Sequence, residues 1–130
     1  MASSTFPKSE RLCSRRLIDQ LYAEGHRLMA FPYSVQWMEV NELPAPCQVM
    51  IVAPKRKFKH AVDRNRVRRL TRECWRQRKD PFYDSLRERG CCIVLSLVYI
   101  HNEIMPYAQL EHKMDKLLMA LQQDIEASRS

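Results

Sequence analysis

Glycine is nearly absent from this sequence of 130 residues, which contains only Gly25 and Gly90. A Gly-rich phosphate-binding loop needs several glycines within a few residues, so folds that depend on such a loop are excluded. No apolar run approaches the ~20 residues that a membrane span requires, and the first residues lack the hydrophobic core of a signal peptide. We therefore expect a cytoplasmic protein that contacts no membrane.

The sequence also lacks the clustered side chains of a protein active site. Its four histidines are scattered outside any metal-binding motif, and its carboxylates are dispersed. The five cysteines include no C-x-x-C pair, and the adjacent Cys91 and Cys92 would point to opposite faces of a strand. We expect reduced structural thiols, no catalytic residue, and no metal or cofactor in the protein itself.

Positive charge, in contrast, is concentrated in one stretch. Residues 54–79 hold twelve of the 22 basic residues and only two acidic ones, which gives this segment a charge of +10. The remaining ten basic and thirteen acidic residues leave the rest of the chain at −3. Such a distribution favours a polyanionic partner.

Residues 61–79 have the pattern of a helix that ends at Asp80 and Pro81. Val67, Leu70 and Cys74 fall on one side of it, and the opposite side carries almost only arginine. A solvated face is the ordinary interpretation of surface charge, but such faces normally mix signs. Because arginine offers a planar set of donors that suits phosphate oxygens, we favour contact with nucleic acid.

The rest of the chain predicts a single α+β domain over residues 1–130, with loose ends at 1–8 and 127–130. A helix is expected over 15–24, capped by Ser14 and ended by Gly25 in a left-handed conformation. Strands are expected over 33–40 and 47–53, paired as an antiparallel hairpin, and over 91–100, buried on both faces. A charged connection at 81–90 and a last helix opened by Pro106 complete the order.

A second candidate surface lies between the first helix and the sheet. There Tyr22 and Phe31 could stack on bases, and Ser34 and Gln36 could form hydrogen bonds to a single strand. Burial of both aromatic rings is the alternative that the pattern leaves open.

The segment 55–76, with AVDRNRVRRLTRE at 61–73, closely resembles the signature of the protein subunit of bacterial ribonuclease P. Phe6, Arg11 and Leu12 resemble the opening of that family, and Gly25 matches its helix-ending glycine. The resemblance implies a fold like the second domain of ribosomal protein S5, ordered αβββαβα, with a central mixed sheet and a left-handed crossover. It therefore replaces the right-handed default for a strand–helix–strand unit.

The resemblance also implies a function. In this family the catalyst is an RNA subunit, which uses bound Mg²⁺ to remove the 5′ leader of precursor tRNA. The protein docks on that catalytic RNA and holds the leader in a cleft. By position, the RNA-binding residues are Lys55, Arg56, Lys57, Lys59, Arg64, Asn65, Arg66, Arg68, Arg69, Arg72 and Arg76. The cleft residues are Ile18, Tyr22, Ser34 and Gln36, with Gln36 standing where some members place an aromatic residue.

Three other functions are alternatives to this one. A ribosomal or assembly protein would clamp folded RNA without touching a substrate. A DNA-binding regulator would place the basic helix in a major groove, but the sequence offers no helix-turn-helix partner. A protein nuclease would need the catalytic cluster that the sequence lacks.

Overall fold

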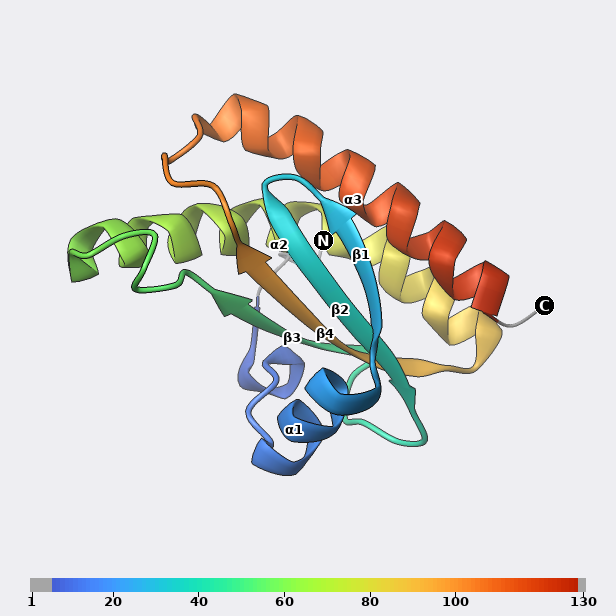
Figure 1. Cartoon of the computed structure of the whole chain (residues 1–130). Helices are drawn as coiled ribbons and strands as arrows, with labels where there is room; N and C mark the ends of the chain where they lie inside the picture. The colour runs from blue at the N-terminus through green and yellow to red at the C-terminus, as the bar shows by residue number, and fades with distance from the viewer. Residues whose placement is uncertain (1–5, 129–130) are drawn as a thin grey trace.

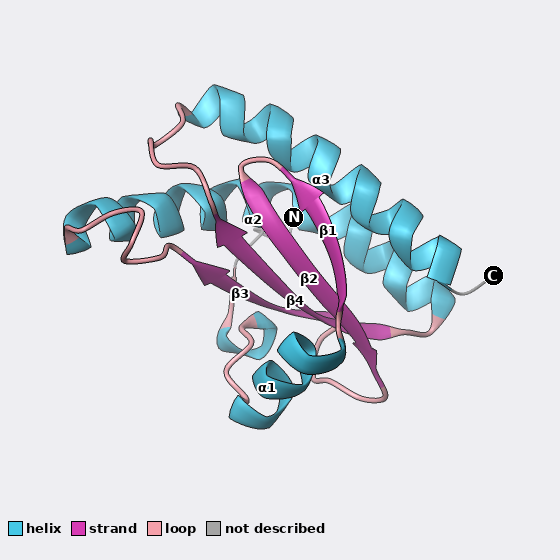
Figure 2. Cartoon of the chain, in the orientation of Figure 1, coloured by secondary structure: helices cyan, strands magenta, loops and turns pink. Residues whose placement is uncertain are grey.

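A four-stranded sheet lies between helices of two separate layers in the computed structural model, which describes residues 6–128 (Figures 1 and 2). In chain order, the elements are η1 (Lys8–Glu10), α1 (Arg15–Glu24), β1 (His26–Ala30), β2 (Tyr33–Val40), β3 (Cys47–Val52), α2 (Ala61–Arg89), β4 (Cys92–Tyr99) and α3 (Tyr107–Ser128). The predicted α+β class and mixed sheet are confirmed.

The predicted hairpin between residues 33–40 and 47–53 is wrong. The strand order is β1-β2-β4-β3, so β2 and β3 both pair with β4 and not with each other. β2 runs antiparallel to β4, whereas β3 runs parallel to it. The hairpin partner of β2 is instead β1, a strand that residue patterns did not locate. The nearly continuous apolar run of β4 occupies a central position because side chains on both of its faces are covered.

The connection from β3 through α2 to β4 is a crossover between parallel strands. In Figure 1 both strands point to the left, β3 lies below β4, and α2 crosses behind the sheet from left to right. This arrangement gives the crossover a left-handed sense, as the family resemblance implies and against the usual preference.

Alternating side chains of the sheet form two separate cores. Tyr33, Val35 and Trp37 of β2 pack with residues of α2 and α3 in the larger core. Met38 of β2 and Val94 of β4 face the other way and pack with Leu21 of α1 in a smaller core. The side chain of Trp37 also donates to Asp124 Oδ2 over 2.7 Å, which fixes α3 to the sheet. The basic helix therefore packs on one face of the sheet, and the candidate surface beside α1 lies on the other face.

The predicted end of the basic helix at Asp80 and Pro81 is also wrong. Helix α2 continues through Pro81 to Arg89, so the expected connection at 81–90 is mostly helical. Proline in a helix interior costs about 3 kcal/mol. Beyond it, however, Phe82, Tyr83 and Leu86 are buried in the larger core, and each such burial contributes about 1.5–3 kcal/mol. Tertiary packing therefore outweighs the local penalty.

We expect Pro81→Ala to raise the free energy of unfolding by about 1–3 kcal/mol, because the alanine restores a backbone donor and removes a steric clash in the helix. Urea denaturation would measure the change. Ser85→Ala, one turn along the same helix, serves as the control and should shift stability by only a few tenths of a kcal/mol, roughly. A loss of stability in Pro81→Ala would show that the proline shapes the packing of Phe82.

The two glycines act differently from one another. Gly25 ends α1, but with φ −68° it is extended and not left-handed as predicted. An added Cβ there would lie 2.4 Å from the carbonyl oxygen of Leu21, so the close approach of the chain requires glycine. Gly90, with φ 66°, is the left-handed residue and ends α2. Ser14 caps α1 as predicted, accepting a hydrogen bond from the amide of Leu17.

The terminal predictions fall partly outside the described residues, since 1–5 and 129–130 are not included. Among the residues that the structure describes, Phe6 packs against the larger core, and α3 extends to Ser128. Pro106 immediately precedes α3, and its carbonyl accepts from the amide of Leu110. Across residues 6–128, no helix combines the length and apolar character needed to cross a membrane.

Candidate nucleic-acid interface

The loop before α2 is a compact turn that presents basic side chains. The carbonyl oxygen of Pro54 accepts hydrogen bonds from the amides of Lys57 and Phe58, and the Phe58 side chain is buried in the larger core. Arg64 then donates from Nη1 to the carbonyl oxygens of Phe58 and Lys59, both over 2.9 Å. Arg64 therefore fastens this loop to the first turns of the helix, which is a positioning role.

Around this fixed point, the predicted RNA-binding residues lie on the loop and the first half of α2. The exposed ones are Lys55, Arg56, Lys59, Asn65, Arg66, Arg69 and Arg72, and Lys57 and Arg68 are half-buried. Arg68 donates to Asn65 Oδ1, which orders that pair on the helix surface. We call residues 55–72 of this set the basic face. The helix N-terminus adds partial positive charge to it.

Ion pairing divides α2 into two functional halves. Within residues 6–128, the cations from Lys55 to Arg72 form no salt bridge, and every cation of α2 that does so lies at Arg76 or beyond. Arg78 binds Glu111 and Asp115 of α3, and Lys79 binds Glu10 of η1. The second half of the helix is therefore held against α3 and η1 by ion pairs, whereas the positive charge of the first half is not neutralised by a salt bridge within residues 6–128.

Glu73 marks the boundary between these halves. Hydrogen bonds from Arg76 and then Gln77 lower the pKa of the Glu73 carboxyl to about 2. This carboxylate is therefore ionised and engaged at any physiological pH. Arg76 was predicted from the sequence to bind RNA, but its guanidinium forms a salt bridge with Glu73. Its guanidinium is consequently less available to a partner than those of Arg69 and Arg72, which form no salt bridge within residues 6–128.

The predicted cleft residues lie on the opposite face of the sheet. Tyr22 of α1 is 41% exposed, and its hydroxyl is hydrogen-bonded to Ser96 Oγ of β4 over 3.2 Å. Ser96 is the register partner of Gln36 on β2, so these side chains share one patch. Ser34 lies two residues further along the same face, and Ile18 packs one helical turn from Tyr22 in the smaller core. The structure thus brings the four predicted residues to one side of the sheet.

Gln36 has an unusual environment within this patch. The residue is only 8% exposed, and its Nε2 atom is buried without a hydrogen-bond partner. An unsatisfied buried donor costs about 1–3 kcal/mol. Because few native donors remain unpaired, this amide is suited to an acceptor supplied by a ligand. Its position beside Ser96 in this patch supports the predicted role of Gln36 in hydrogen bonding.

The alternative in which both candidate aromatic rings are buried is wrong. Phe31 is 45% exposed and Tyr22 nearly as much. Phe31, however, belongs to the β1–β2 turn and packs against His101, with ring centroids 5.2 Å apart. Tyr22 is therefore the aromatic residue that the structure places beside the polar patch.

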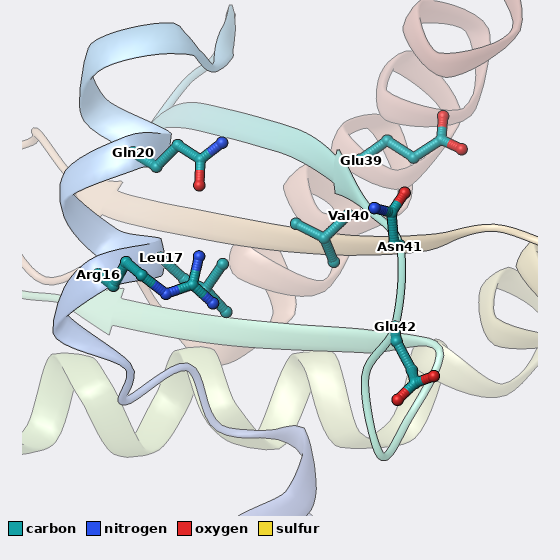
Figure 3. Close-up of a pocket in the computed structure, with 7 residues that line it drawn as sticks. All are labelled: Arg16, Leu17, Gln20, Glu39, Val40, Asn41 and Glu42. Carbon is teal, nitrogen blue, oxygen red and sulfur yellow. The ribbon is translucent and has the colours of Figure 1, made fainter.

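A cavity of about 380 Å³ lies at the other end of α1, beside the loop that follows β2 (Figure 3). Arg16 and Gln20 line it from the helix, and Glu39 and Glu42 from the strand end and loop. Because the two carboxylates repel phosphate, this end is poorly suited to RNA. The RNA-compatible part of the α1 face is consequently the part around Tyr22 and Ser96.

Sequence reasoning missed Ser96, which completes the polar patch. The signal was present, because Ser96 is the one polar residue in the apolar run CIVLSLVY of β4. What the pattern did not reveal was which strand would lie beside β2. Only the strand order shows that Ser96 and Gln36 are neighbours.

The described residues contain no arrangement suited to protein-borne catalysis. No group of three or more His, Cys, Asp or Glu side chains within 6–128 could hold a metal ion. Burial raises the pKa of the Cys74 thiol to about 11 and also raises that of Cys47. These thiols are therefore protonated and unreactive at neutral pH.

Comparisons with known proteins agree with this geometry. The family model described as Ribonuclease P matches residues 6–122. A ribonuclease P protein component from Porphyromonas gingivalis is 32% identical over 122 residues, covering 93% of this chain and 89% of the relative. Another from Syntrophus aciditrophicus is 39% identical over 82 residues, covering 63% and 66%.

Solved structures show the same fold. The Staphylococcus aureus RNase P protein superposes with a TM-score of 0.69 at 18% identity, covering 88% of this chain and 96% of that one. The Thermotoga maritima RNase P protein gives a TM-score of 0.62 at 20% identity, covering 84% and 94%. None of these matches supports a ribosomal or assembly protein.

Proposed function

Because this chain belongs to the ribonuclease P protein family and is thus a subunit of an endoribonuclease, we propose that it docks on the catalytic RNA through its basic face and binds the 5′ leader of precursor tRNA. The observation that carries this proposal is the unpaired basic face on residues 55–72. Unpaired surface cations repel one another, and a phosphate backbone relieves that repulsion.

The two surfaces have separate roles in this mechanism. The basic face neutralises phosphates of the RNA subunit, which lets two polyanions, the RNA subunit and the substrate, approach each other. The patch of Tyr22, Ser96 and Gln36 accepts a single strand, whose bases stack on Tyr22 and whose acceptors meet the amide of Gln36. Mg²⁺ bound by the RNA subunit supplies the hydrolytic chemistry when present. The chain itself binds and orients.

Cleavage of a precursor tRNA by its cognate RNase P RNA tests the proposal. Single-turnover rates would be measured at low Mg²⁺ with and without the protein, and with the protein alone. We expect the protein to accelerate cleavage, because it replaces part of the charge neutralisation that Mg²⁺ provides, and to cleave nothing alone. Binding of RNA without any acceleration would instead support a structural RNA-binding role.

Tyr22→Ala is expected to weaken binding of precursor tRNA to the holoenzyme about tenfold, because one base-stacking contact contributes about 1–3 kcal/mol. Mature tRNA, which has no leader, should bind equally well to the holoenzymes that contain wild-type protein and Tyr22→Ala. Phe31→Ala removes a comparably exposed ring outside the patch and serves as the control. Tyr22→Phe separates stacking from the hydrogen bond to Ser96. Equal losses for precursor and mature tRNA would remove Tyr22 from the leader site.

A further inference from the structure

A small cavity of about 170 Å³ opens at the outer edge of β3 and borders the basic face at Arg72. The N-terminal segment contributes Phe6, Arg11 and Leu12 to its lining, β3 contributes residues 49–51, and α2 contributes Arg72. β3 is an edge strand, so this edge separates the α1 face of the sheet from the α2 face. The cavity therefore lies between the basic face and the cleft. We call it the edge notch.

The guanidinium of Arg11 is held in place at this notch. Its Nη2 donates to the carbonyl oxygen of Phe6 over 3.1 Å, and the guanidinium carbon lies 5.6 Å from the centre of the Phe6 ring. A guanidinium has five N–H donors, so most of them remain for another acceptor. Arg11 and Arg72 are both exposed. The notch thus has two arginines from segments far apart in the sequence.

No carboxylate competes for these two arginines. The acidic residues nearest to them in the sequence are Glu10 and Glu73, and both are occupied. Glu10 accepts from Lys79 Nζ and from the hydroxyl of Tyr83, and Glu73 accepts from Arg76 and Gln77. None of the residues that line the notch is acidic. Its positive charge is therefore not neutralised by the described part of the chain.

The backbone of β3 adds a further donor. The amide of Leu12 donates to the carbonyl oxygen of Val49 over 3.0 Å, so the polar groups of Val49 point outward from the sheet. Alternate residues of a strand present their backbone groups to the same edge, which directs the N–H of Ile51 outward as well. Among residues 6–128 the pairing of the N-terminal segment with β3 stops at Arg11 and Val49. The N–H of Ile51 is consequently open to the notch.

We propose that the edge notch binds one phosphodiester group of RNA, held by Arg11, Arg72 and the backbone N–H of Ile51. Two guanidinium groups and a backbone amide on one concave surface match the oxygens of a phosphate. This inference rests on the proposed function and extends it, because an RNA strand held here would pass around the edge of β3 between the cleft and the basic face. The phosphate belongs either to the leader or to the RNA subunit.

Arg11→Gln tests the notch, with Arg87→Gln as the control for loss of one exposed positive charge elsewhere on the protein. In the first arm, single neutral methylphosphonate linkages are scanned through the leader, and holoenzyme affinity is measured for each substrate. We expect one linkage to cost wild type about tenfold, as a charge-assisted contact should, and Arg11→Gln less than twofold. In the second arm, affinity for the RNA subunit alone is compared between the two variants.

If one methylphosphonate linkage weakens binding to wild type but not to Arg11→Gln, the phosphate belongs to the leader. A loss of about tenfold in the second arm, confined to Arg11→Gln, assigns it to the RNA subunit. Arg72→Gln, whose side chain has no partner in the described chain, should reproduce the first-arm result if Arg11→Gln folds poorly. Its affinity for the RNA subunit is not used as a test of the notch, because Arg72 also belongs to the basic face. Arg11→Gln that folds like wild type and behaves like Arg87→Gln in both arms would overturn the inference while the proposed function stands.

A protein-only measurement separates the two proposals. Wild-type protein is titrated with a short single-stranded oligoribonucleotide, and the Nε–H resonances of Arg11 and Arg72 are followed by NMR. Shifts in both resonances would support the notch even if the protein failed to stimulate cleavage. If neither resonance moves while other resonances report binding, the notch is not a phosphate site.

Discussion

Replacing Arg66, Arg69 and Arg72 together with glutamine is expected to lower affinity for the RNA subunit on the order of a hundredfold at moderate salt. All three side chains are exposed on the first half of α2 and form no salt bridge within residues 6–128. Each phosphate contact contributes about 0.7–0.9 to the dependence of log affinity on log salt concentration. The slope should therefore fall by about 2–3, which a salt titration of RNA binding would measure.

A matched control keeps the same change in net charge. Arg87, Lys113 and Lys116 lie on the end of α2 and on α3, away from the basic face. Replacing these three residues with glutamine should leave the salt slope nearly unchanged, because they contact no phosphate in the proposed complex. The thermal stability of the triple variant on the basic face should match that of wild type, since none of its arginines is buried. An unchanged salt slope in that variant would exclude this surface as the docking face.

Lys79→Ala is expected to reduce the free energy of unfolding by about 3–5 kcal/mol, as breaking a buried ion pair typically does. Lys79 and Glu10 lie 2.5 Å apart with side chains only 5% and 12% exposed. The hydroxyl of Tyr83 also donates to this carboxylate over 2.9 Å. Removing the lysine leaves a largely buried carboxylate without its cation, so chemical denaturation should show a large loss.

Two further variants isolate the cause of that loss. Arg87→Ala breaks an exposed pair, in which the side chains are 60% and 67% exposed, and should cost less than about 1 kcal/mol. A double variant, Lys79→Met with Glu10→Leu, removes both charges and should recover much of the stability. If the double variant is as unstable as Lys79→Ala, the loss arises from packing around the Lys79 side chain and not from the unpaired charge.

The ion pairs of Arg78 and Lys79 show why the charge pattern alone did not define the candidate interface. Both belong to the same run of basic residues as Arg69 and Arg72, and each contributes the same charge to it. Their carboxylate partners, Glu111, Asp115 and Glu10, are remote in the sequence. Only the packing of α3 and η1 against the second half of α2 brings these partners within reach.

The continuation of α2 past Pro81 likewise shows that a local sequence signal did not decide the structure. Proline is a strong local stop, and the next available stop is Gly90, which the structure uses. The burial of Phe82, Tyr83 and Leu86 decides between the two. This choice depends on a core that includes residues of α3 and the sheet, so it could not be predicted from the helix sequence.

The sequence by itself determined the features that depend on local composition and short-range periodicity. These are the α+β class, the start of the basic helix, the cap at Ser14 and the concentration of charge in 54–79. The family resemblance supplied the third strand and the hand of the crossover. Each of these requires only neighbours in the chain or a motif within it.

The tertiary structure alone decided which segments lie side by side. It placed β4 between β2 and β3, joined Ser96 to Gln36 and Tyr22, and gathered Arg11 and Arg72 at the edge of β3. Strand order and ion-pair partners depend on the total free energy of the packed core, to which residues distant in sequence contribute as much as adjacent ones. For that reason candidate binding residues could be named from the sequence, but the surfaces that they form could not.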